Sequence, residues 1–376
     1  MDVTARQLNR ATLARQLLLQ RERIGVVAGV HRVVALQAQE PASPYLALWN
    51  RLDGFEPAEL DAAFAAHRVV KATLMRITLH AVTAEDHPRF HAAMVRNLRA
   101  SRLNDRRFNA TGLTIEQVDD LLPELLAFVR TPRTKAEIEA MLADRLGASH
   151  GPGLWWAMRT FAPVVHAPTD APWTFGTRPA FRAAPTVPAE DAEAALQHLV
   201  WRYLEGFGPA TAEDVAQFAL QQRKVVRAAI ESLRHRLVRL EGPDGRVLFD
   251  VPEGVVPDAD VPAPPRFLPM WDSVLLAYLD RSRLVPPAYR KLVTRRNGDV
   301  LPTLLVDGEV CGVWRPVEGG IEARAFHPLR NQDWLGLAAE AQPLSELLAQ
   351  RDADVYGRYR RWWTDLPAAE VRVLGA

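Results

Sequence analysis

The hydrophobic period changes along residues 190–251. Apolar positions recur every three to four residues up to Gly206, again between Thr211 and Phe218, and again over residues 223–236, which predicts three successive helices. The stretch that follows, "LVRLEGPDGRVLFDV", alternates apolar and polar positions on either side of Gly-Pro-Asp-Gly, as the two strands of a β-hairpin do. A winged helix consists of three helices followed by a hairpin, and its third helix contacts DNA. The pattern of residues 190–251 therefore predicts a winged helix.

The same order occurs twice more along the chain. Residues 114–176 contain three helical patterns and then two apolar stretches for a hairpin, "VVHAPTDAPWTFG". Residues 4–83 contain one more helical pattern before their hairpin, "RVVKATLMRITLHAV". The predicted helices of this first segment run to Arg23 and over Val26–Leu36, Pro44–Leu52 and Pro57–Ala66. Three tandem copies of one DNA-binding unit predict a protein that wraps a duplex.

The pattern changes again near Arg266, after the proline-rich hinge "PDADVPAPPRFLP". Short apolar strands then alternate with tight turns, which predicts a small antiparallel β-barrel. The turns fall at Asn297–Gly298, Asp307–Gly308 and Gly319–Gly320. Two helical patterns would close the barrel, over Asp333–Gln350 and Val355–Trp363.

The predicted fold class is therefore α+β, with three tandem winged-helix (helix-turn-helix) modules followed by a β-barrel domain with helices. The first module would carry the two glutamines discussed below. The predicted boundaries of the three modules and the barrel domain are 1–108, 109–186, 187–255 and 266–376.

Composition narrows the class of protein without assigning a function. The 376 residues are 48% hydrophobic and 24% charged, which is ordinary for a folded protein and excludes wholesale disorder. The first residues, "MDVTARQLNRATLARQLLLQRER", are amphipathic and lack the apolar core of a signal peptide, and no run of about 18 apolar residues could span a membrane. We therefore expect a cytoplasmic, nucleoid-associated protein with no membrane partner.

Cysteine and histidine give no metal-binding pattern. The single cysteine, Cys311, excludes an internal disulfide and any cysteine-cluster site for zinc or iron–sulfur. The ten histidines show no paired metal-ligand spacing. We expect neither a metal nor a cofactor.

Basic residues are concentrated in three places, although the formal net charge is only +1. The first cluster recurs at steps of three, three and four, so one helix would carry it as a stripe; it comprises Arg96, Arg99, Arg102 and Arg106. The second lies between residues 221 and 239 and includes Arg223, Lys224 and Arg227. The third lies between residues 281 and 296 and includes Arg281, Arg283, Arg295 and Arg296. Each could be a solvated face, but three such surfaces on a nearly neutral chain predict binding to double-stranded DNA.

Two long neutral amides, Gln37 and Gln39, stand one residue apart in the otherwise apolar run "RVVALQAQEPASPYLALWN". If Val33–Ala38 is helical and the chain leaves this helix extended, both amides converge on one spot. On spacing alone, such a pair is more often a surface or capping feature at a helix exit.

Three motifs together resemble the winged-helix DNA glycosylase family that includes the azinomycin-resistance enzyme AlkZ. They are "QAQ", "TLMRITLHAV" and "LPMWDSVLLAYLDRSRLVPPAYRKLVTRRNGDVLPTLLVDGEVCGVW". The resemblance covers nearly the whole chain, and it implies that Gln37-Ala38-Gln39 is the family's catalytic glutamine–aliphatic–glutamine motif. It also implies excision of N7-alkylated purines, including the unhooking of interstrand cross-links, in DNA repair and in self-resistance to a genotoxic natural product. The family pattern has a glycine where this chain has Ile77.

The chemistry of two amides fits such a substrate. Neither amide has a useful pKa, so neither is a general base. An N7-alkylated guanine is already cationic and can leave C1′ without a general acid. The two amides then need only hold a water and direct carbonyl dipoles at the oxocarbenium ion. An intact, uncharged nucleotide would not be cleaved.

Other side chains near these motifs are candidates for the active site. Glu40 is the nearest carboxylate and could activate the water, or could be a surface charge before a proline. His80 shares a strand face with Thr78 and could contact the DNA, or could be a half-buried histidine. Trp271 and Asp272 begin the predicted barrel and could reach the cleft, or could be a core tryptophan and a turn aspartate.

Lysine is rare in this chain, and this bears on the mechanism. None of the four lysines lies in the "QAQ" segment, so we expect a monofunctional glycosylase that leaves an abasic site; they are Lys71, Lys135, Lys224 and Lys291. A winged-helix transcription regulator and a non-catalytic DNA-damage-binding protein are the alternatives. The sequence shows no dimerisation heptads and three non-identical hairpins, which favours a monomer on one lesion.

Overall fold

The structure, a computed structural model, describes residues 2–147 and 151–375. The α-helices are α1 (Ala5–Arg15), α2 (Val26–Arg32), α3 (Ser43–Trp49), α4 (Pro57–Ala65), α5 (His87–Leu103), α6 (Arg106–Asn109), α7 (Ile115–Phe128), α8 (Lys135–Leu146), α9 (Gly151–Phe161), α10 (Ala192–Phe207), α11 (Ala212–Ala219), α12 (Arg223–Ser232), α13 (Arg290–Val293) and α14 (Asn331–Arg351). Short 3₁₀ helices are η1 (Met75–Ile77), η2 (Pro243–Gly245), η3 (Ser273–Leu275), η4 (Arg281–Arg283) and η5 (Gly357–Trp363).

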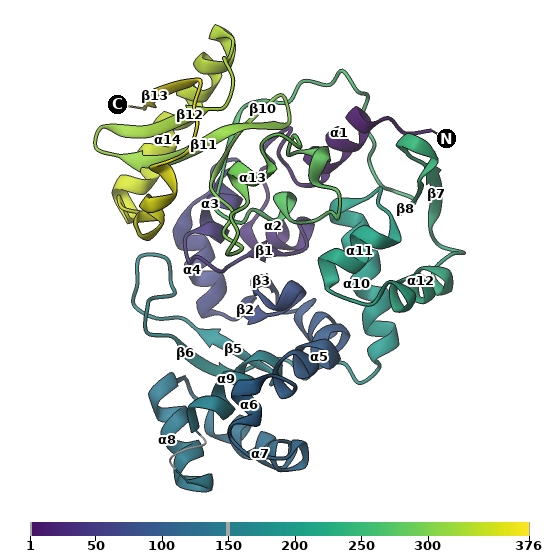
Figure 1. The fold of residues 1–376 in the computed structure, drawn as a ribbon, viewed down its shortest axis with the longest axis vertical. Helices are drawn as coiled ribbons and strands as arrows, with labels where there is room; N and C mark the ends of the chain where they lie inside the picture. The colour runs from purple at the N-terminus through teal and green to yellow at the C-terminus, as the bar shows by residue number, and fades with distance from the viewer. Residues whose placement is uncertain (1, 148–150, 376) are drawn as a thin grey trace.

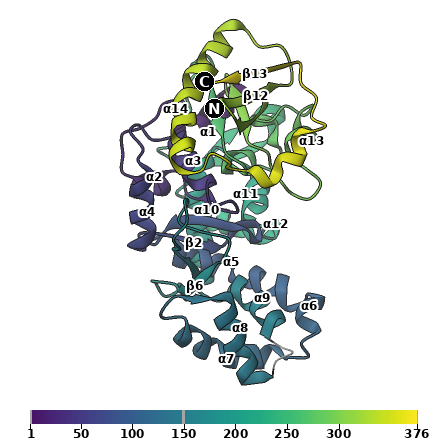
Figure 2. The ribbon, with the colours of Figure 1, turned by 90° about the vertical axis from the view of Figure 1, so that its left-hand side faces the viewer.

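The strands form three antiparallel sheets in the described part of the chain. They are β1 (Leu36–Gln37), β2 (Val69–Thr73), β3 (Leu79–Thr83), β4 (Arg133–Thr134), β5 (Val164–Ala167), β6 (Ala180–Ala183), β7 (Val238–Glu241), β8 (Val247–Asp250), β9 (Arg266–Leu268), β10 (Thr303–Val306), β11 (Glu309–Val317), β12 (Gly320–Ala325) and β13 (Glu370–Leu374). The C-terminal sheet lies at one corner of the molecule, α10–α12 lie on the opposite side, and α7–α9 form the far end of the long axis (Figure 1). Figure 2 shows the same separation of α7–α9 from the rest of the fold.

One sheet combines strands from the first two predicted modules. Its order is β1-β3-β2-β5-β6-β4, so the β2–β3 hairpin stands next to the β5–β6 pair. The two meet where Lys71 of β2 pairs with His166 of β5. α5 packs against both α9 and α10 and joins this sheet to the third segment. The two predicted modules therefore share one sheet, although their boundary stays a prediction.

The order of three helices and a strand pair, read from the hydrophobic period, is present in two described segments. α7, α8 and α9 precede β5 and β6, and α10, α11 and α12 precede β7 and β8. Threonine caps begin several of these helices: the hydroxyls of Thr114, Thr134 and Thr211 each accept the N–H of the residue three positions on. α12 buries Val226 and Ile230 and exposes its basic face. The winged-helix interpretation of these segments stays a prediction.

The C-terminal sheet is open rather than closed into the predicted β-barrel. Its order is β13-β12-β11-β10-β9, and no pairing among the described residues joins the edge strands β9 and β13. α14 packs on β9, β12 and β13 and covers the apolar side chains that a closed barrel would enclose. The predicted turn at Asp307–Gly308 is confirmed, with φ of 48° and 82°. Of the two predicted closing helices, the first is α14 and the second is the 3₁₀ segment η5.

The second helix ends earlier than its apolar pattern predicts. α2 stops at Arg32, and Val34 has a left-handed φ of 72°, through which an α-helix does not continue. The chain then extends as β1 and pairs with β3. The predictions of a helix over Val26–Leu36 and of helical backbone over Val33–Ala38 are therefore wrong.

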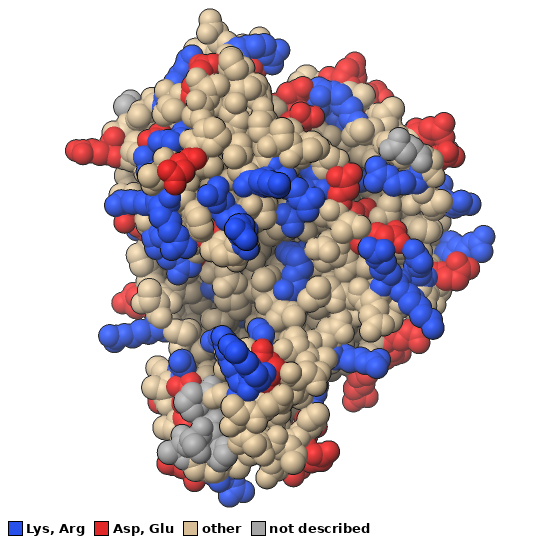
Figure 3. Space-filling view, in the orientation of Figure 1, with Lys and Arg blue, Asp and Glu red and all other residues tan. Residues whose placement is uncertain are grey.

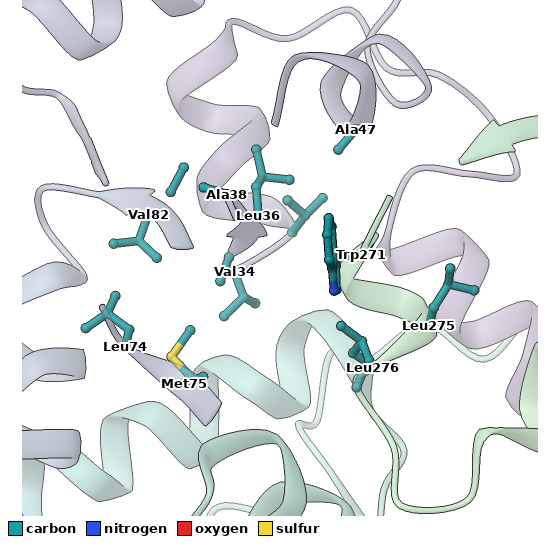
Figure 4. Close-up of a cluster of buried hydrophobic side chains, with 14 of the residues drawn as sticks. Val34, Leu36, Ala38, Ala47, Leu74, Met75, Val82, Trp271, Leu275 and Leu276 are labelled. Carbon is teal, nitrogen blue, oxygen red and sulfur yellow. The ribbon is translucent and has the colours of Figure 1, made fainter. Parts of the chain in front are cut away.

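Hydrophobic packing fixes the segment around β1 (Figure 4). Val34 and Leu36 lie between side chains of the β2–β3 hairpin, among them Val82, and Trp271 and Leu276 on the other side. Burial of each large aliphatic side chain contributes about 1.5–3 kcal/mol to stability, so tertiary contacts rather than local propensity hold this short strand.

Among the described residues, the helices are too short or too polar to cross a membrane.

Candidate active site and nucleic-acid surface

β1 places Gln37 beside His80. β1 is an edge strand of the six-stranded sheet, and its antiparallel register with β3 sets Gln37 opposite His80. Directly opposed residues on antiparallel strands have Cβ atoms about 4.5–5.5 Å apart on one face. The ladder continues where the Ala38 N–H donates to the Leu79 carbonyl at 2.8 Å. The structure thus brings together two candidate residues that are distant in the sequence.

The two glutamines are linked through the backbone of the second. Gln37 is buried, and its Oε1 accepts the N–H of Gln39 at 2.6 Å. The Gln37 Nε2 atom and the side-chain amide of Gln39 have no hydrogen-bond partner among the described residues. Gln39 is exposed and lines a cavity. The first amide therefore positions the backbone of the second, and each keeps polar atoms for a ligand.

His80 is neutral in this fold. Burial, and then the positive charge of Arg76, lower the pKa of His80 to about 3. Its Nδ1–H donates to the Thr78 carbonyl at 3.1 Å and its Nε2 accepts from Arg76 at 3.2 Å, a pattern that only the neutral ring can make. The Thr78 hydroxyl donates to the Met75 carbonyl at 3.1 Å within the hairpin turn. His80 therefore offers no acidic proton at neutral pH.

The turn between β2 and β3 has two left-handed residues. Arg76 and Ile77 have φ of 54° and 58°, a region that β-branched residues rarely enter. The glycine expected at position 77 would adopt positive φ at no steric cost, so Ile77 is a strained substitute. The turn directs the Arg76 guanidinium to the Phe218 ring, 5.1 Å from its centroid, and ties the hairpin to α11.

Glu40 is engaged by the C-terminal segment. Its carboxylate pairs with Arg358 and accepts the Tyr359 hydroxyl at 2.8 Å. Trp271 packs edge-on against Tyr359, with ring centroids 5.6 Å apart, so it reaches the candidate site through that tyrosine. A carboxylate held by two donors is a weaker base for water activation than a free one.

Asp272 lies in a buried ion pair. Both of its carboxylate oxygens accept from Arg51 at 2.8 Å, and both side chains are almost fully buried. Asp272 also caps η3 by accepting the Val274 N–H at 3.2 Å. These contacts favour the turn-aspartate interpretation of Asp272 over a place in the cleft.

A cavity of ≈ 380 Å³ opens beside Gln39 and Glu40. Its lining also includes Lys71 and His166, and the loop between β5 and β6 supplies Trp173 and Phe175. Lys71 is absent from the residues predicted for the site. The sequence feature that could have indicated it is a single lysine in the apolar strand "RVVKATL", where a charged side chain is buried.

Lys and Arg side chains gather around a hollow in the middle of one face, in front of the strands β1–β3 (Figure 3). The predicted stripe on one helix is wrong in one respect: α5 ends at Leu103, and Arg106 begins α6, because Asp105 caps a new helix there.

The basic candidates divide into exposed and structurally engaged side chains. Exposed residues without a hydrogen bond or ion pair to any described residue are Arg96, Arg106, Arg223, Lys224 and Arg296. Residues with such a bond, or stacked on an aromatic ring, are Arg99, Arg102, Arg227, Arg281, Arg283 and Arg295. In this conformation only the first group has guanidinium and ammonium groups free of such contacts. We therefore expect the three clusters to contribute unequally to phosphate binding.

No group of three or more His, Cys, Asp and Glu side chains in the described ranges is arranged to hold a metal ion. The strand register sets Gln37 and His80 on one face of the sheet and Lys71 and His166 on the other, so among the sequence-predicted candidates only Gln39 and Glu40 line the cavity.

Comparison with known proteins identifies the family. The family described as "DNA glycosylase AlkZ-like" matches residues 30–347 of the sequence. The solved structure of DNA glycosylase AlkZ from Streptomyces sahachiroi has a TM-score of 0.80 to this fold at 21% sequence identity, covering 93% of this chain and 98% of that one. No curated protein sequence matches the chain. Because the family match spans most of its length, the chain belongs to the AlkZ-like DNA glycosylase family.

Proposed function

We propose that this chain is a monofunctional glycosylase that hydrolyses the N-glycosidic bond of N7-alkylated purines in duplex DNA, including purines in interstrand cross-links. The observation that carries the proposal is the charge state of the site. Gln37 and Gln39 are neutral amides, His80 is a neutral histidine, and the neighbouring carboxylate of Glu40 is engaged. The two amides, the neutral histidine and the ionised carboxylate offer no general acid, and a purine that is already cationic needs none.

The residues then act on the sugar rather than on the base. The Gln37 Oε1 accepts the Gln39 backbone N–H, which fixes the backbone from which the exposed Gln39 side chain reaches the cavity. From there a glutamine carbonyl can accept a hydrogen bond from the attacking water and direct its negative end at the oxocarbenium ion that develops at C1′. The proton that the added water releases passes to solvent. The departing base is neutral once the bond is broken, so no proton needs to reach it.

The selectivity follows from the chemistry of these residues. An unmodified guanine leaves as an anion unless it is protonated, and neither the two amides nor the neutral His80 supplies a proton for that purpose. Damage that places a positive charge on the base therefore determines which nucleotides are cleaved. In the cell, such an activity would serve DNA repair and self-resistance to a genotoxic alkylating agent.

The decisive experiment follows excision under single-turnover conditions. Duplexes containing one N7-methylguanine, or one N7–N7 guanine cross-link, are incubated with excess protein and treated with mild alkali that cleaves abasic sites. Strand breaks at the lesion and none at unmodified guanines would support the proposal. Binding without breaks would favour a damage-binding protein, and sequence-specific binding of undamaged duplex as a dimer would favour a transcription regulator.

We expect no covalent trapping of the protein on DNA by borohydride during excision. Of the four lysines, only Lys71 lines the cavity among the described residues, and it lies on β2, outside the Gln37–Gln39 segment at which the water attacks C1′. Water is then the nucleophile and an abasic site is the product. The measurement is denaturing electrophoresis after borohydride quenching, with a bifunctional glycosylase as the positive control. A stoichiometric adduct that Lys71→Met abolishes would contradict the monofunctional assignment.

Reversing two exposed arginines should weaken DNA binding without changing specificity. Arg96→Glu combined with Arg223→Glu removes two phosphate contacts and should lower affinity for lesion and undamaged duplex by the same factor. The slope of log K against log salt should fall by about 2. Fluorescence anisotropy at several salt concentrations measures both quantities. Arg372→Glu, on the distant strand β13, is the matched control, and equal affinities for all three proteins at low salt would show that the two arginines are only a solvated face.

A further inference from the structure

The cavity beside Gln39 has the size and lining of a ligand pocket. Its volume of ≈ 380 Å³ falls in the range of small-molecule sites, about 300–1,000 Å³. Gln39 lines it, and so do Lys71 and His166, which pair across β2 and β5. The loop between β5 and β6 adds the rings of Trp173 and Phe175. The lining also includes polar side chains, among them Glu40, Asp352 and Arg358, and aromatic rings combined with polar groups are typical of a site for a planar ligand.

Lys71 is a buried donor with no hydrogen-bond or ion-pair partner among the described residues. Its side chain is 3% exposed and makes no hydrogen bond or ion pair with any described residue, and its Nζ lies 4.6 Å from the centroid of the Phe175 ring. Burial alone lowers the pKa of Lys71 to about 7, because no carboxylate offsets the desolvation. A leucine or methionine would pack in this strand at less cost. The amine therefore stands in the cavity wall as a donor that a ligand can satisfy.

The aromatic walls are held in place before any ligand binds. Trp173 Nε1 donates to Asp352 at 3.1 Å, and Phe175 packs edge-on to Phe64 with ring centroids 4.8 Å apart. Between them, the Thr174 hydroxyl donates to a carboxylate of α4 at 2.6 Å. A preorganised wall loses little conformational entropy on binding.

We infer that this cavity receives a planar aromatic group of the lesion, with a carbonyl acceptor directed at Lys71, while Gln39 acts at its mouth. The inference rests on the proposed glycosylase function and names what the same site recognises. The rings of Trp173 and Phe175 contribute to the lining, and such a group can pack against them. The Lys71 amine provides the hydrogen bond that orients it.

Two parts of an alkylated guanine carry this chemistry. One is the purine itself, whose O6 is a carbonyl acceptor. The other is an aromatic substituent with its own carbonyl, left on N7 by the alkylating agent. Two lesions separate these sources: N7-methylguanine has only the first, and N7-phenacylguanine has both.

The test compares single-turnover excision of the two lesions by the parental protein, Lys71→Met and Phe175→Leu. Lys135→Met is the matched control, because Lys135 lies on α8 and pairs with Glu139 at 3.6 Å, outside the cavity. Loss of the hydrogen bond should slow Lys71→Met about tenfold, with duplex affinity unchanged. Lys71→Met should also melt at a higher temperature than the parental protein, since it removes a buried, unpaired amine; slow excision by a more stable protein excludes misfolding.

The outcomes distinguish the purine from the substituent as the group in the cavity, and they distinguish failure of this inference from failure of the proposed glycosylase function. Slower excision of both lesions by Lys71→Met assigns the cavity to the purine, and slower excision of the phenacyl lesion alone assigns it to the substituent. Parental rates for Lys71→Met and Phe175→Leu on both lesions would overturn the inference and leave the glycosylase function standing. If the parental protein excises neither lesion, the proposed function fails, and the inference fails with it.

Discussion

Gln37→Ala and Gln39→Ala should each slow single-turnover excision of N7-alkylguanine about a hundredfold, because the loss of one preorganised polar contact costs about 3 kcal/mol of transition-state stabilisation. DNA affinity should stay nearly constant, since it comes from phosphate contacts. Gel-based excision assays and anisotropy titrations measure the two quantities on the same duplex. Gln342→Ala, an exposed glutamine of α14, is the matched control.

The two substitutions should not be additive. Gln37 acts on the reaction partly through Gln39, because its Oε1 holds the Gln39 N–H at 2.6 Å. Once Gln37 is removed, the backbone that presents Gln39 is no longer fixed, so the double variant should be little slower than the slower single variant. Gln39→Glu places a carboxylate at the same position and should retain activity that Gln39→Ala loses. If both alanine variants are folded and excise at the parental rate, the pair is structural and Glu40 becomes the next residue to test.

Asp272→Ala should lower the free energy of unfolding by about 3–5 kcal/mol, because it leaves the buried guanidinium of Arg51 without its counter-charge. The cap of η3 is lost as well. Urea unfolding followed by tryptophan fluorescence measures the change. Asp354→Ala removes an exposed aspartate that pairs with the exposed Arg360 and should change stability by less than about 0.5 kcal/mol.

The double substitution Arg51→Met with Asp272→Leu isolates the cause. Replacing both members of a buried ion pair by apolar side chains leaves no uncompensated charge, so most of the lost stability should return. Excision per folded molecule should be close to parental in both proteins. A stable Asp272→Ala protein with a hundredfold slower excision would instead place this carboxylate in the chemistry.

Local patterns predicted the elements whose boundaries depend on nearby residues. α10, α11, α12 and the β7–β8 hairpin follow from hydrophobic period, a threonine cap and the Gly-Pro-Asp-Gly turn. The helix predicted through Leu36 fails because the left-handed Val34 is stabilised by packing between distant segments, which no local pattern records. Barrel closure fails for a similar reason: whether two edge strands meet depends on where α14 packs.

The candidate site also has features that the sequence predicted and features that depend on the tertiary fold. The motif "QAQ" and its resemblance located Gln37 and Gln39 in the sequence, but the hydrogen bond between them depends on β1, which only the sheet creates. The pairing of Gln37 with His80 and the neutral state of that histidine arise from register and burial. The sequence did not predict Lys71 as a site residue, because its burial and its lack of a hydrogen-bond or ion-pair partner among the described residues depend on the folded environment and not on its neighbours in the sequence.

The sheet shared by residues 36–83 and 133–183 has a mechanical consequence. To rotate one segment relative to the other, the chain would have to break the ladder where Lys71 meets His166 and the helix packing that α5 provides. These segments therefore move as one body together with α5, which carries Arg96, Arg99 and Arg102 and packs against α9 and α10. A duplex that binds this basic surface must adapt to a fixed shape, so the flexibility of the DNA around a lesion, and not that of the protein, should determine which lesions bind most tightly.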